Sequence, residues 1–555
     1  MKETYISLMD RILDAYSHEH ILRYFEAVKQ EGIREHGFPR LTANLGILIA
    51  NGRRCAYTDL FIQMMDTCCE SFLKPKIPGL GNDFSVKEII FCLLEVEQAN
   101  CVPKEKTAYW RSLLARIEPS ACYNVFAVSR EDNLHNWALF TAVSEHMRQF
   151  SGLADTNAFV DLQLATQMKR LDENGMYQDP NNPIVYDLAP RGLFSVLMHF
   201  GYHGEFYDAI DTCLQKAGLL TLQMQSVTGE IPYGGRSNQF LHNESTLAQI
   251  MEFEANRYAA LGNLQLAGQF KAGARKALEN IKSWLDRKQL THIKNNYPLD
   301  TQYGCEGYAY FDKYMVTAAS FLYVSYLFCN DTIAEYPLPE KAEAFSLPPH
   351  FHKSFLRNQN WFVEMDTDAD FHYDANGIGR IHRAGAPASI CLSTPGTATP
   401  NYTTAPEMLA NFAIAAGIEK DGQLIFATDP GVTYTKTGEA ITEDTASVSM
   451  LCDFGGKTAG LDCLIAPTCV KISVSAEGKA ALMLPAFAFD GKEAVQITCR
   501  HTVLEIQYQK YLCRYTADGP ILDLDKRGMN RNGEYRLFCA QGTNHVSVTV
   551  EIEPF

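Results

Sequence analysis

The feature that most constrains the fold of this chain is a change in the spacing of its apolar residues near residue 340. Up to about residue 335, apolar residues recur every three or four positions, which is the spacing of an amphipathic helix. Beyond residue 350 they alternate with polar residues, which is the spacing of a strand in an antiparallel sheet. The sequence therefore predicts an all-α domain at 1–335, a proline-rich linker at 336–350 and an all-β domain at 351–555.

The helical half contains long polar loops between its helices. They recur at intervals of roughly fifty to sixty residues, at 127–136, 172–191, 226–243 and 292–312. Helical hairpins arranged in a ring bring such loops together on one face. We therefore expect an α/α toroid or incomplete barrel. The most apolar run, 315–329, is too short to cross a bilayer and predicts a buried helix.

The second half is expected to be an antiparallel β-sandwich. Turn signals rich in glycine and asparagine separate its alternating segments. The clearest of these predicted strands are 388–393, 423–428, 470–475, 502–508 and 545–552.

Composition excludes several classes of function. The net charge of -16 argues against nucleic-acid binding and against an anionic membrane surface. The chain begins without an apolar segment of signal-peptide length, and its 16 cysteines form no Cys-x-x-Cys pair, so we expect free thiols in the cytoplasm. Metal-ligand spacings and phosphate-binding glycine loops are absent from the sequence, so we expect no metal and no cofactor. A homo-oligomer is compatible with this composition.

Two of the loops end in polar residues that directly precede a helix. His135 and Asn136 are read either as substrate-binding groups or as a helix N-cap beside a buried tryptophan. In the second loop, Tyr186, Asp187 and Arg191 begin the next helix. Asp187 either caps that helix or belongs to an active site.

The third loop begins with two glycines that are followed by several polar side chains. Gly234 and Gly235 permit backbone angles that other residues avoid, so the side chains after them can be aimed into a cleft. Glu244 lies on the apolar face of the following helix, where a carboxylate is costly unless it is paired or functional. It is either a catalytic acid, a helix cap, or the partner of Arg257 or Lys271 in a buried ion pair. The candidate site residues of this loop and of the helix start are Arg236, Asn238, His242 and Glu244.

The fourth loop is dense in tyrosine and carries a carboxylate, with Tyr303 and Tyr308 on either side of Glu306. Aromatic rings stack on the apolar faces of pyranoses while polar groups bind the hydroxyls, so this loop predicts sugar binding. The alternative is aromatic packing at a domain interface. In the β half, the basic turn at 377–385 either reaches the rim of the helical face or forms a surface hairpin.

This architecture resembles the heparinase II/III-like polysaccharide lyases and the toroid-type β-glucuronidases. The lyases, notably the toroid alginate lyases, resemble this chain at Asn136 and around Tyr186-Asp-Leu-Ala-Pro-Arg191. The resemblance implies an asparagine with a histidine or arginine that neutralises a uronate carboxylate, and a tyrosine after an arginine-bearing stretch that exchanges protons. Here no tyrosine follows Arg191 until Tyr202, so Tyr186 or Tyr303 would take that role. The segments Gly-Gly-Arg-Ser-Asn-Gln and His-Asn-Glu are more similar to the hydrolases.

Our first hypothesis is an exo-acting β-glucuronidase-type glycoside hydrolase that acts on short uronate-containing oligosaccharides. Glu244 would be the general acid, and Asp187 or Glu306 the second carboxylate. The residues expected to bind the substrate are Arg191, Arg236, Asn238, His242, Tyr303 and Tyr308.

The second hypothesis is β-elimination by a lyase on the same class of substrate. In that reaction Asn136, His135 or Arg191 neutralises the carboxylate, and Tyr186 acts as base and acid. A third, non-enzymatic alternative is a carbohydrate-binding protein whose toroid lacks chemistry.

Overall fold

The computed structural model describes residues 1–76, 81–287, 289–347, 349–408 and 410–555. Within these ranges, 14 α-helices precede 15 strands, which confirms the predicted order of an α/α half followed by an antiparallel β half. The last helix ends at Phe328 and the first strand begins at Glu343. Pro348 of the predicted linker lies outside the described residues.

The helices follow one another with short connections and the long loops noted above. They are α1 (Lys2–Leu13), α2 (His18–Glu31), α3 (Gly37–Ala50), α4 (Thr58–Ser71), α5 (Asn82–Ala99), α6 (Lys104–Leu114), α7 (Pro119–Cys122), α8 (Trp137–Phe150), α9 (Asn157–Gln167), α10 (Val185–His199), α11 (Tyr207–Met224), α12 (His242–Ala260), α13 (Leu264–Leu285) and α14 (Phe311–Phe328).

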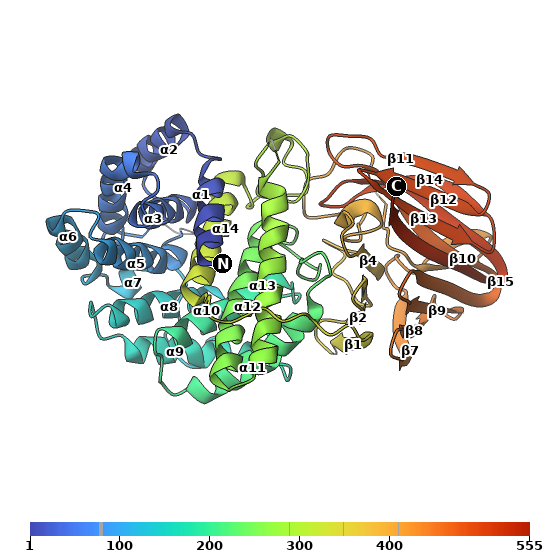
Figure 1. The fold of residues 1–555 in the computed structure, drawn as a ribbon, viewed down its shortest axis with the longest axis horizontal. Coiled ribbons are helices and arrows are strands. Elements are labelled where there is room, and N and C mark those ends of the chain that lie inside the picture. The colour runs from blue at the N-terminus through green and yellow to red at the C-terminus, as the bar shows by residue number, and fades with distance from the viewer. Residues whose placement is uncertain (77–80, 288, 348, 409) are drawn as a thin grey trace.

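Six of these helices form a closed inner ring. Contacts run from α3 to α5, α8, α10, α12 and α14, and from α14 back to α3, while outer helices such as α4, α9, α11, α13 and α1 pack against this ring (Figure 1). The apolar run at 315–329 falls in α14, where nearly every side chain is buried, as predicted. Because inner and outer helices alternate along the chain, all six inner helices start on the same face of the toroid.

The strands are all paired antiparallel. They are β1 (Glu343–Leu347), β2 (Lys353–Arg357), β3 (Trp361–Asp366), β4 (Gly377–Arg383), β5 (Ala416–Lys420), β6 (Gln423–Phe426), β7 (Thr433–Ile441), β8 (Ala446–Asp453), β9 (Thr458–Ile465), β10 (Val470–Phe489), β11 (Gln496–Arg500), β12 (Val503–Tyr508), β13 (Tyr511–Ala517), β14 (Ile521–Met529) and β15 (Glu534–Pro554).

Two long strands, β10 and β15, connect the two layers of the sandwich. The first part of β10 pairs with β9, and after a register shift between Ser475 and Lys479 its second part pairs with β5. Likewise β15 pairs with β14 at its start and with β13 at its end. The strands on either side of this pair therefore form one 11-stranded sheet that folds over a common apolar core.

Four of the five predicted strands are confirmed, because they fall in β6, β10, β12 and β15. The predicted strand at 388–393 is wrong. It begins with a short 3-10 helix, Ala388–Ile390, and only Leu392 forms a bridge, to Ile381. Two buried apolar residues two positions apart imitate the alternation of a strand in this irregular segment.

A small sheet of β1 to β4 lies between the helices and the large sheet (Figure 1). The basic segment at 377–385, predicted as a turn, is largely the buried strand β4, so the surface-hairpin alternative is wrong. Arg380 of β4 donates to the backbone oxygen of Ile231 at 2.6 Å, and His382 shares a hydrogen bond of 2.7 Å with Ser226. The third loop of the toroid is thus fixed against the β half.

Candidate active site

Residues at the starts of the inner helices touch one another around the ring. His36 before α3 packs on Phe84 of α5 at 5.1 Å between ring centroids, and Phe84 packs on Trp137 of α8 at 4.8 Å. On the other side of the ring, Tyr314 of α14 lies 6.2 Å from His36. The predicted polar loops lead into the inner helices between Trp137 and Tyr314. They therefore lie at the same face of the toroid.

Three predicted site residues lie together around the carboxylate of Asp179. Two of them contact it directly, and the third contacts one of those two. Asn136 immediately precedes α8, but its side chain does not cap the helix and instead donates to Asp179 Oδ1 at 3.1 Å. Arg236 forms an ion pair with the other oxygen of Asp179 and lies 4.7 Å above the ring of Tyr186. Asp179 is almost fully buried, so it fixes the orientation of both donors.

A chain of hydroxyl groups extends from Tyr186 to the fourth loop. The Tyr186 hydroxyl lies 3.1 Å from Ser237 Oγ, which lies 2.8 Å from the hydroxyl of Tyr308. The backbone N–H of Ser237 donates to Glu306 at 2.6 Å. Tyr308 is 37% exposed, so this chain opens to solvent.

The β half contributes one cation to the base of this site. Arg531, in the turn between β14 and β15, donates to both oxygens of Glu306 at 2.9 and 2.6 Å. Its guanidinium lies 4.5 Å from the ring of Tyr402. Both members of the ion pair are nearly fully buried, which makes it a clamp between the two halves.

The electrostatic environment keeps the tyrosines neutral in the free protein. Burial, followed by the neighbouring Tyr314, raises the pKa of Tyr186 well above 10, against a hydrogen bond from Ser237 that lowers it. Burial likewise raises the pKa of Tyr308. Burial also lowers the pKa of His135, with smaller contributions from Arg170 and Arg236, so its imidazole is neutral at pH 7.

Asp187 and Arg191 pair with each other instead of with the groups of this network. Both side chains are fully buried and form a two-pronged ion pair within α10, at 2.8 and 2.5 Å. Asp187 also accepts the backbone N–H of Tyr177 at 2.8 Å. With no exposed surface, the pair braces the second loop. Asp187 does not cap the helix, which was the alternative considered from the sequence, and its burial does not suit a catalytic role.

Glu244 is also fully buried. Lys294 donates to it at 2.9 Å, and Ile231 N–H donates at 3.3 Å. The buried ion pair considered from the sequence therefore exists, with Lys294 as the partner in place of Arg257 or Lys271. A carboxylate enclosed in this way is not placed to protonate a leaving group.

Of three other predicted binding residues, two are buried and the third packs against its own loop. His242 stacks with Phe240 at 5.8 Å between ring centroids, and burial lowers the pKa of His242 to about 3. Asn238 is buried and donates to the backbone oxygen of Pro232. Tyr303 packs edge-on against a tyrosine of the same loop, which matches the aromatic-packing alternative.

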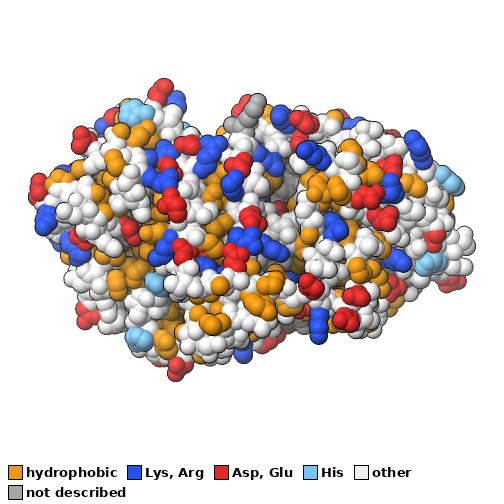
Figure 2. Space-filling view, viewed as in Figure 1, with side chains coloured by type: hydrophobic (Ala, Val, Ile, Leu, Met, Phe, Trp, Pro, Cys, Tyr) orange, Lys and Arg blue, Asp and Glu red, His pale blue; other side chains and the backbone are white. Residues whose placement is uncertain are grey.

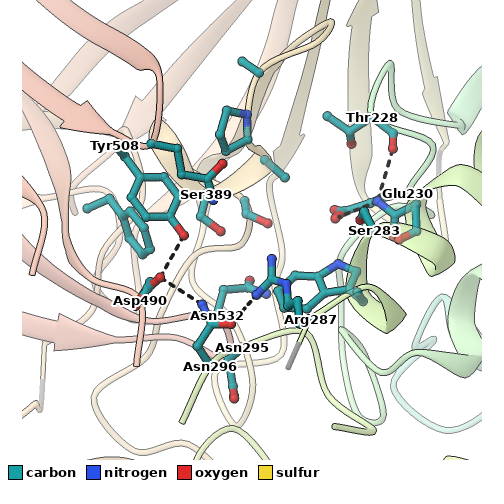
Figure 3. Close-up of a pocket in the computed structure, with 18 of the residues that line it drawn as sticks. Thr228, Glu230, Ser283, Arg287, Asn295, Asn296, Ser389, Asp490, Tyr508 and Asn532 are labelled. Atoms are coloured by element: carbon teal, nitrogen blue, oxygen red, sulfur yellow. Dashed lines mark hydrogen bonds between the residues drawn. The ribbon is translucent and has the colours of Figure 1, made fainter. Parts of the chain in front are cut away.

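A separate cavity of about 1050 Å³ lies between α13 and the β half, where Figure 2 shows the surface hollowed. None of the predicted site residues lines it. In Figure 3, Asp490 accepts from Tyr508 and from Asn296, both at 2.9 Å, and Arg287 points toward Asn296. These polar groups are engaged with each other, so we place the candidate site at the toroid face instead.

Comparison with known proteins gives matches only among solved structures. No protein-family model matches the chain. No curated protein matches it either. The chondroitin AC lyase of Streptomyces coelicolor A3, in complex with chondroitin sulphate, is similar at 12% identity and a TM-score of 0.46, over 99% of this chain and 82% of that chain.

Two further similar structures are those of heparinase III and of a Paenibacillus xanthan lyase. For heparinase III the identity is 9% and the TM-score 0.38, over 85% of this chain and 77% of that chain. For the xanthan lyase the identity is 9% and the TM-score 0.47, over 93% of this chain and 53% of that chain. These proteins are polysaccharide lyases by name, one of the classes that the sequence resembles. At such identities and TM-scores they assign no residue and no reaction to this chain.

Among the residues described in the structure, no helix is long and apolar enough to cross a membrane.

Proposed function

We propose that this chain is a lyase that cleaves a uronate glycosidic bond by β-elimination. The observation that carries the proposal is the meeting of an amide, a guanidinium and a phenol at one face, from Asn136, Arg236 and Tyr186. Elimination beside a carboxylate needs these three kinds of group and no catalytic pair of carboxylic acids.

The reaction begins at the uronate proton on C5, next to the carboxylate. Asn136 and Arg236 donate hydrogen bonds to the carboxylate and stabilise the negative charge that grows on its oxygens as the proton leaves. The ionised form of Tyr186 takes this proton. The C4–O4 bond then breaks, a C4=C5 double bond forms, and the phenol returns a proton to O4.

The toroid itself favours an anionic substrate. All six inner helices begin at this face, so their partly positive ends point toward the site. This field is short in range, yet it acts in the same direction as Arg236. It also explains how a chain with a net charge of -16 can bind an acidic sugar locally.

The hydrolase, our first hypothesis from the sequence, has less support. It needs two carboxylates facing the glycosidic bond. Glu244 and Asp187 are fully buried in ion pairs, and Glu306 is held by Arg531. We therefore prefer the lyase alternative.

The test is incubation with a panel of uronate-containing oligosaccharides, following ultraviolet absorbance and new reducing ends together. We expect both signals to rise in parallel, because each elimination makes one reducing end and one conjugated unsaturated uronate. The Tyr186→Phe variant is expected to lose both. The control variant is Tyr336→Phe, which changes an exposed tyrosine that follows α14. New reducing ends without absorbance would make the protein a hydrolase and refute the proposal.

A further inference from the structure

Beside the candidate site, the floor of the toroid holds positive charges that are only partly neutralised. Arg40 of α3 lies 2.8 Å from His36, and its ion pair with Glu88 is long, at 3.4 Å. Lys87 of α5 shares the same carboxylate at 2.5 Å. Arg40 and Lys87 are almost fully buried, so one carboxylate serves two cations in a medium that screens them poorly.

A third cation, Lys313 of α14, is close enough to the same histidine to lower its pKa. Burial first, then Arg40, Lys313 and Lys87, hold the pKa of His36 well below 6.5. The imidazole is therefore neutral and adds no charge. The excess positive charge rests on the three basic side chains.

Lys313 is the member of this group that can meet a ligand. Within the described part of the chain, its backbone is hydrogen-bonded to Tyr310 and Thr317, but its ammonium makes no hydrogen bond and no ion pair. Its ammonium lies 5.9, 5.6 and 5.8 Å from the ring centroids of Tyr308, Tyr310 and Tyr314. Tyr308 and Tyr310 are 37% and 40% exposed, so the cation sits among rings that open to solvent.

The carboxylates of Glu35 and Asp312 have hydrogen-bond or ion-pair partners other than Lys313. Glu35 accepts hydrogen bonds from the hydroxyl of Tyr24 and from a backbone N–H, and burial raises its pKa. It acts on the charge of Lys313 through space, without an ion pair between the two. Asp312 lies 2.9 Å from His20. Lys313 is thus left for a group from outside the chain.

We propose that Lys313, with the rings of Tyr308 and Tyr310, forms a subsite for an anionic substituent on a sugar adjacent to the reacting uronate. The substituent is a sulfate or a second carboxylate. The rings stack on the sugar and the ammonium binds the anion, while Arg40 and Lys87 strengthen the local field from below. The position of the subsite follows from the hydroxyl chain, which joins Tyr308 through Ser237 to Tyr186. The inference rests on the proposed function and names the substrate more closely.

The experiment is calorimetric binding to the Tyr186→Phe protein, which we expect to hold substrate without turnover. The probes are three matched tetrasaccharides in which the sugar beside the uronate carries no charge, one sulfate or one carboxylate. We expect at least one charged probe to bind roughly tenfold more tightly than the neutral one, and inorganic sulfate to compete with it. Whichever charged probe binds better identifies the substituent.

Adding Lys313→Met is expected to abolish this preference, whereas Lys313→Arg keeps it. The matched control is Lys104→Met, which removes an exposed lysine at the start of α6. A preference that survives Lys313→Met, equal binding of the three probes, or no binding of any probe would each overturn the subsite.

Failure of the subsite can be told apart from failure of the lyase. If the wild-type protein cleaves no substrate but the Lys313-dependent preference is present, the proposed function is wrong and the subsite stands. If the wild type eliminates all three probes equally well and binds them equally, the reverse is true.

Discussion

Arg236 combines three contacts that a different cation would not reproduce. Its guanidinium pairs with Asp179, donates to the backbone oxygen of Pro180 at 2.9 Å and lies over the ring of Tyr186. About a quarter of the side chain is exposed, which leaves it accessible to the proposed substrate. The planar fork is what permits pairing and stacking together.

Replacing Arg236 by lysine should therefore reduce activity while the charge is kept. We expect kcat/KM for elimination to fall by about tenfold to a thousandfold, because a lysine is a point charge that cannot stack and bind two groups at once. Thermal unfolding should change little. The matched control is Arg130→Lys, which alters an exposed arginine paired with Glu205 and should leave kcat/KM unchanged. Equal losses in the two variants would contradict the role given to Arg236.

The raised pKa of Tyr186 predicts the direction of the pH dependence. The base of the proposed reaction is the ionised phenol, and burial raises the pKa of this phenol. The ionised fraction therefore grows as pH rises toward that pKa. We expect kcat/KM to increase with pH by about tenfold per unit over the alkaline range in which the protein stays folded. A profile that falls with rising pH would indicate that Tyr186 is not the base.

At the scale of an element, the turn before α12 determines where Arg236 and Ser237 lie. Gly234 and Gly235 have φ angles of 135° and 74°. A Cβ atom at Gly235 would lie 2.5 Å from Cβ of Pro183, in the neighbouring loop. Both the backbone angle and the close approach require glycine there.

Gly235→Ala should accordingly affect stability and activity together. We expect a loss of about 1–3 kcal/mol in the free energy of unfolding from strain and overlap, and a larger loss of kcat/KM as the turn shifts. Denaturant unfolding and steady-state assays measure the two effects.

Gly262→Ala is the control that separates backbone strain from overlap of the added Cβ with its neighbours. Its φ of 79° is similar, but no atom lies within 4 Å of the added Cβ. It should cost only the backbone strain and leave elimination intact. If the two variants were equally stable and equally active, the close approach to Pro183 would not matter.

At the scale of the whole molecule, the site depends on both halves of the chain. Glu306 of the toroid and Arg531 of the sandwich are separated by 225 residues in sequence. Arg380 and His382 of β4 hold the third loop from the same side. The β half thus fixes the loops of the toroid from behind.

Arg531→Met should destabilise the protein and reduce activity. Removing one partner of a buried ion pair leaves Glu306 uncompensated, which costs about 3–5 kcal/mol in the free energy of unfolding. Adding Glu306→Gln to this variant should recover part of the loss. The exposed pair of Arg130 and Glu205 is the control, since breaking it with Arg130→Met should cost less than about 1 kcal/mol. A double variant less stable than Arg531→Met alone would contradict this account.

The sequence by itself determined the class of fold. Apolar spacing is a local property, so the change in spacing near residue 340 was enough to predict helices before it and strands after it. The regular spacing of the polar loops along the sequence predicted the toroid. Of the predicted site residues, Asn136, Tyr186, Arg236 and Tyr308 lie in one network, because polar side chains just ahead of a helix start face the same end of the ring.

Only the tertiary structure decided which of the predicted polar residues join the candidate site and which are buried in ion pairs. Asp179 and Ser237, which connect the predicted residues, lie in the second and third loops but carry no distinguishing pattern. Arg531 has no local signal, since its partner is far away in the chain. For Glu244 and Asp187 the spacing of residues is the same whether a carboxylate is catalytic or buried in an ion pair. Only the packing of Lys294 and Arg191 against them distinguishes the two cases, because a charge is tolerated inside a protein when a partner compensates it.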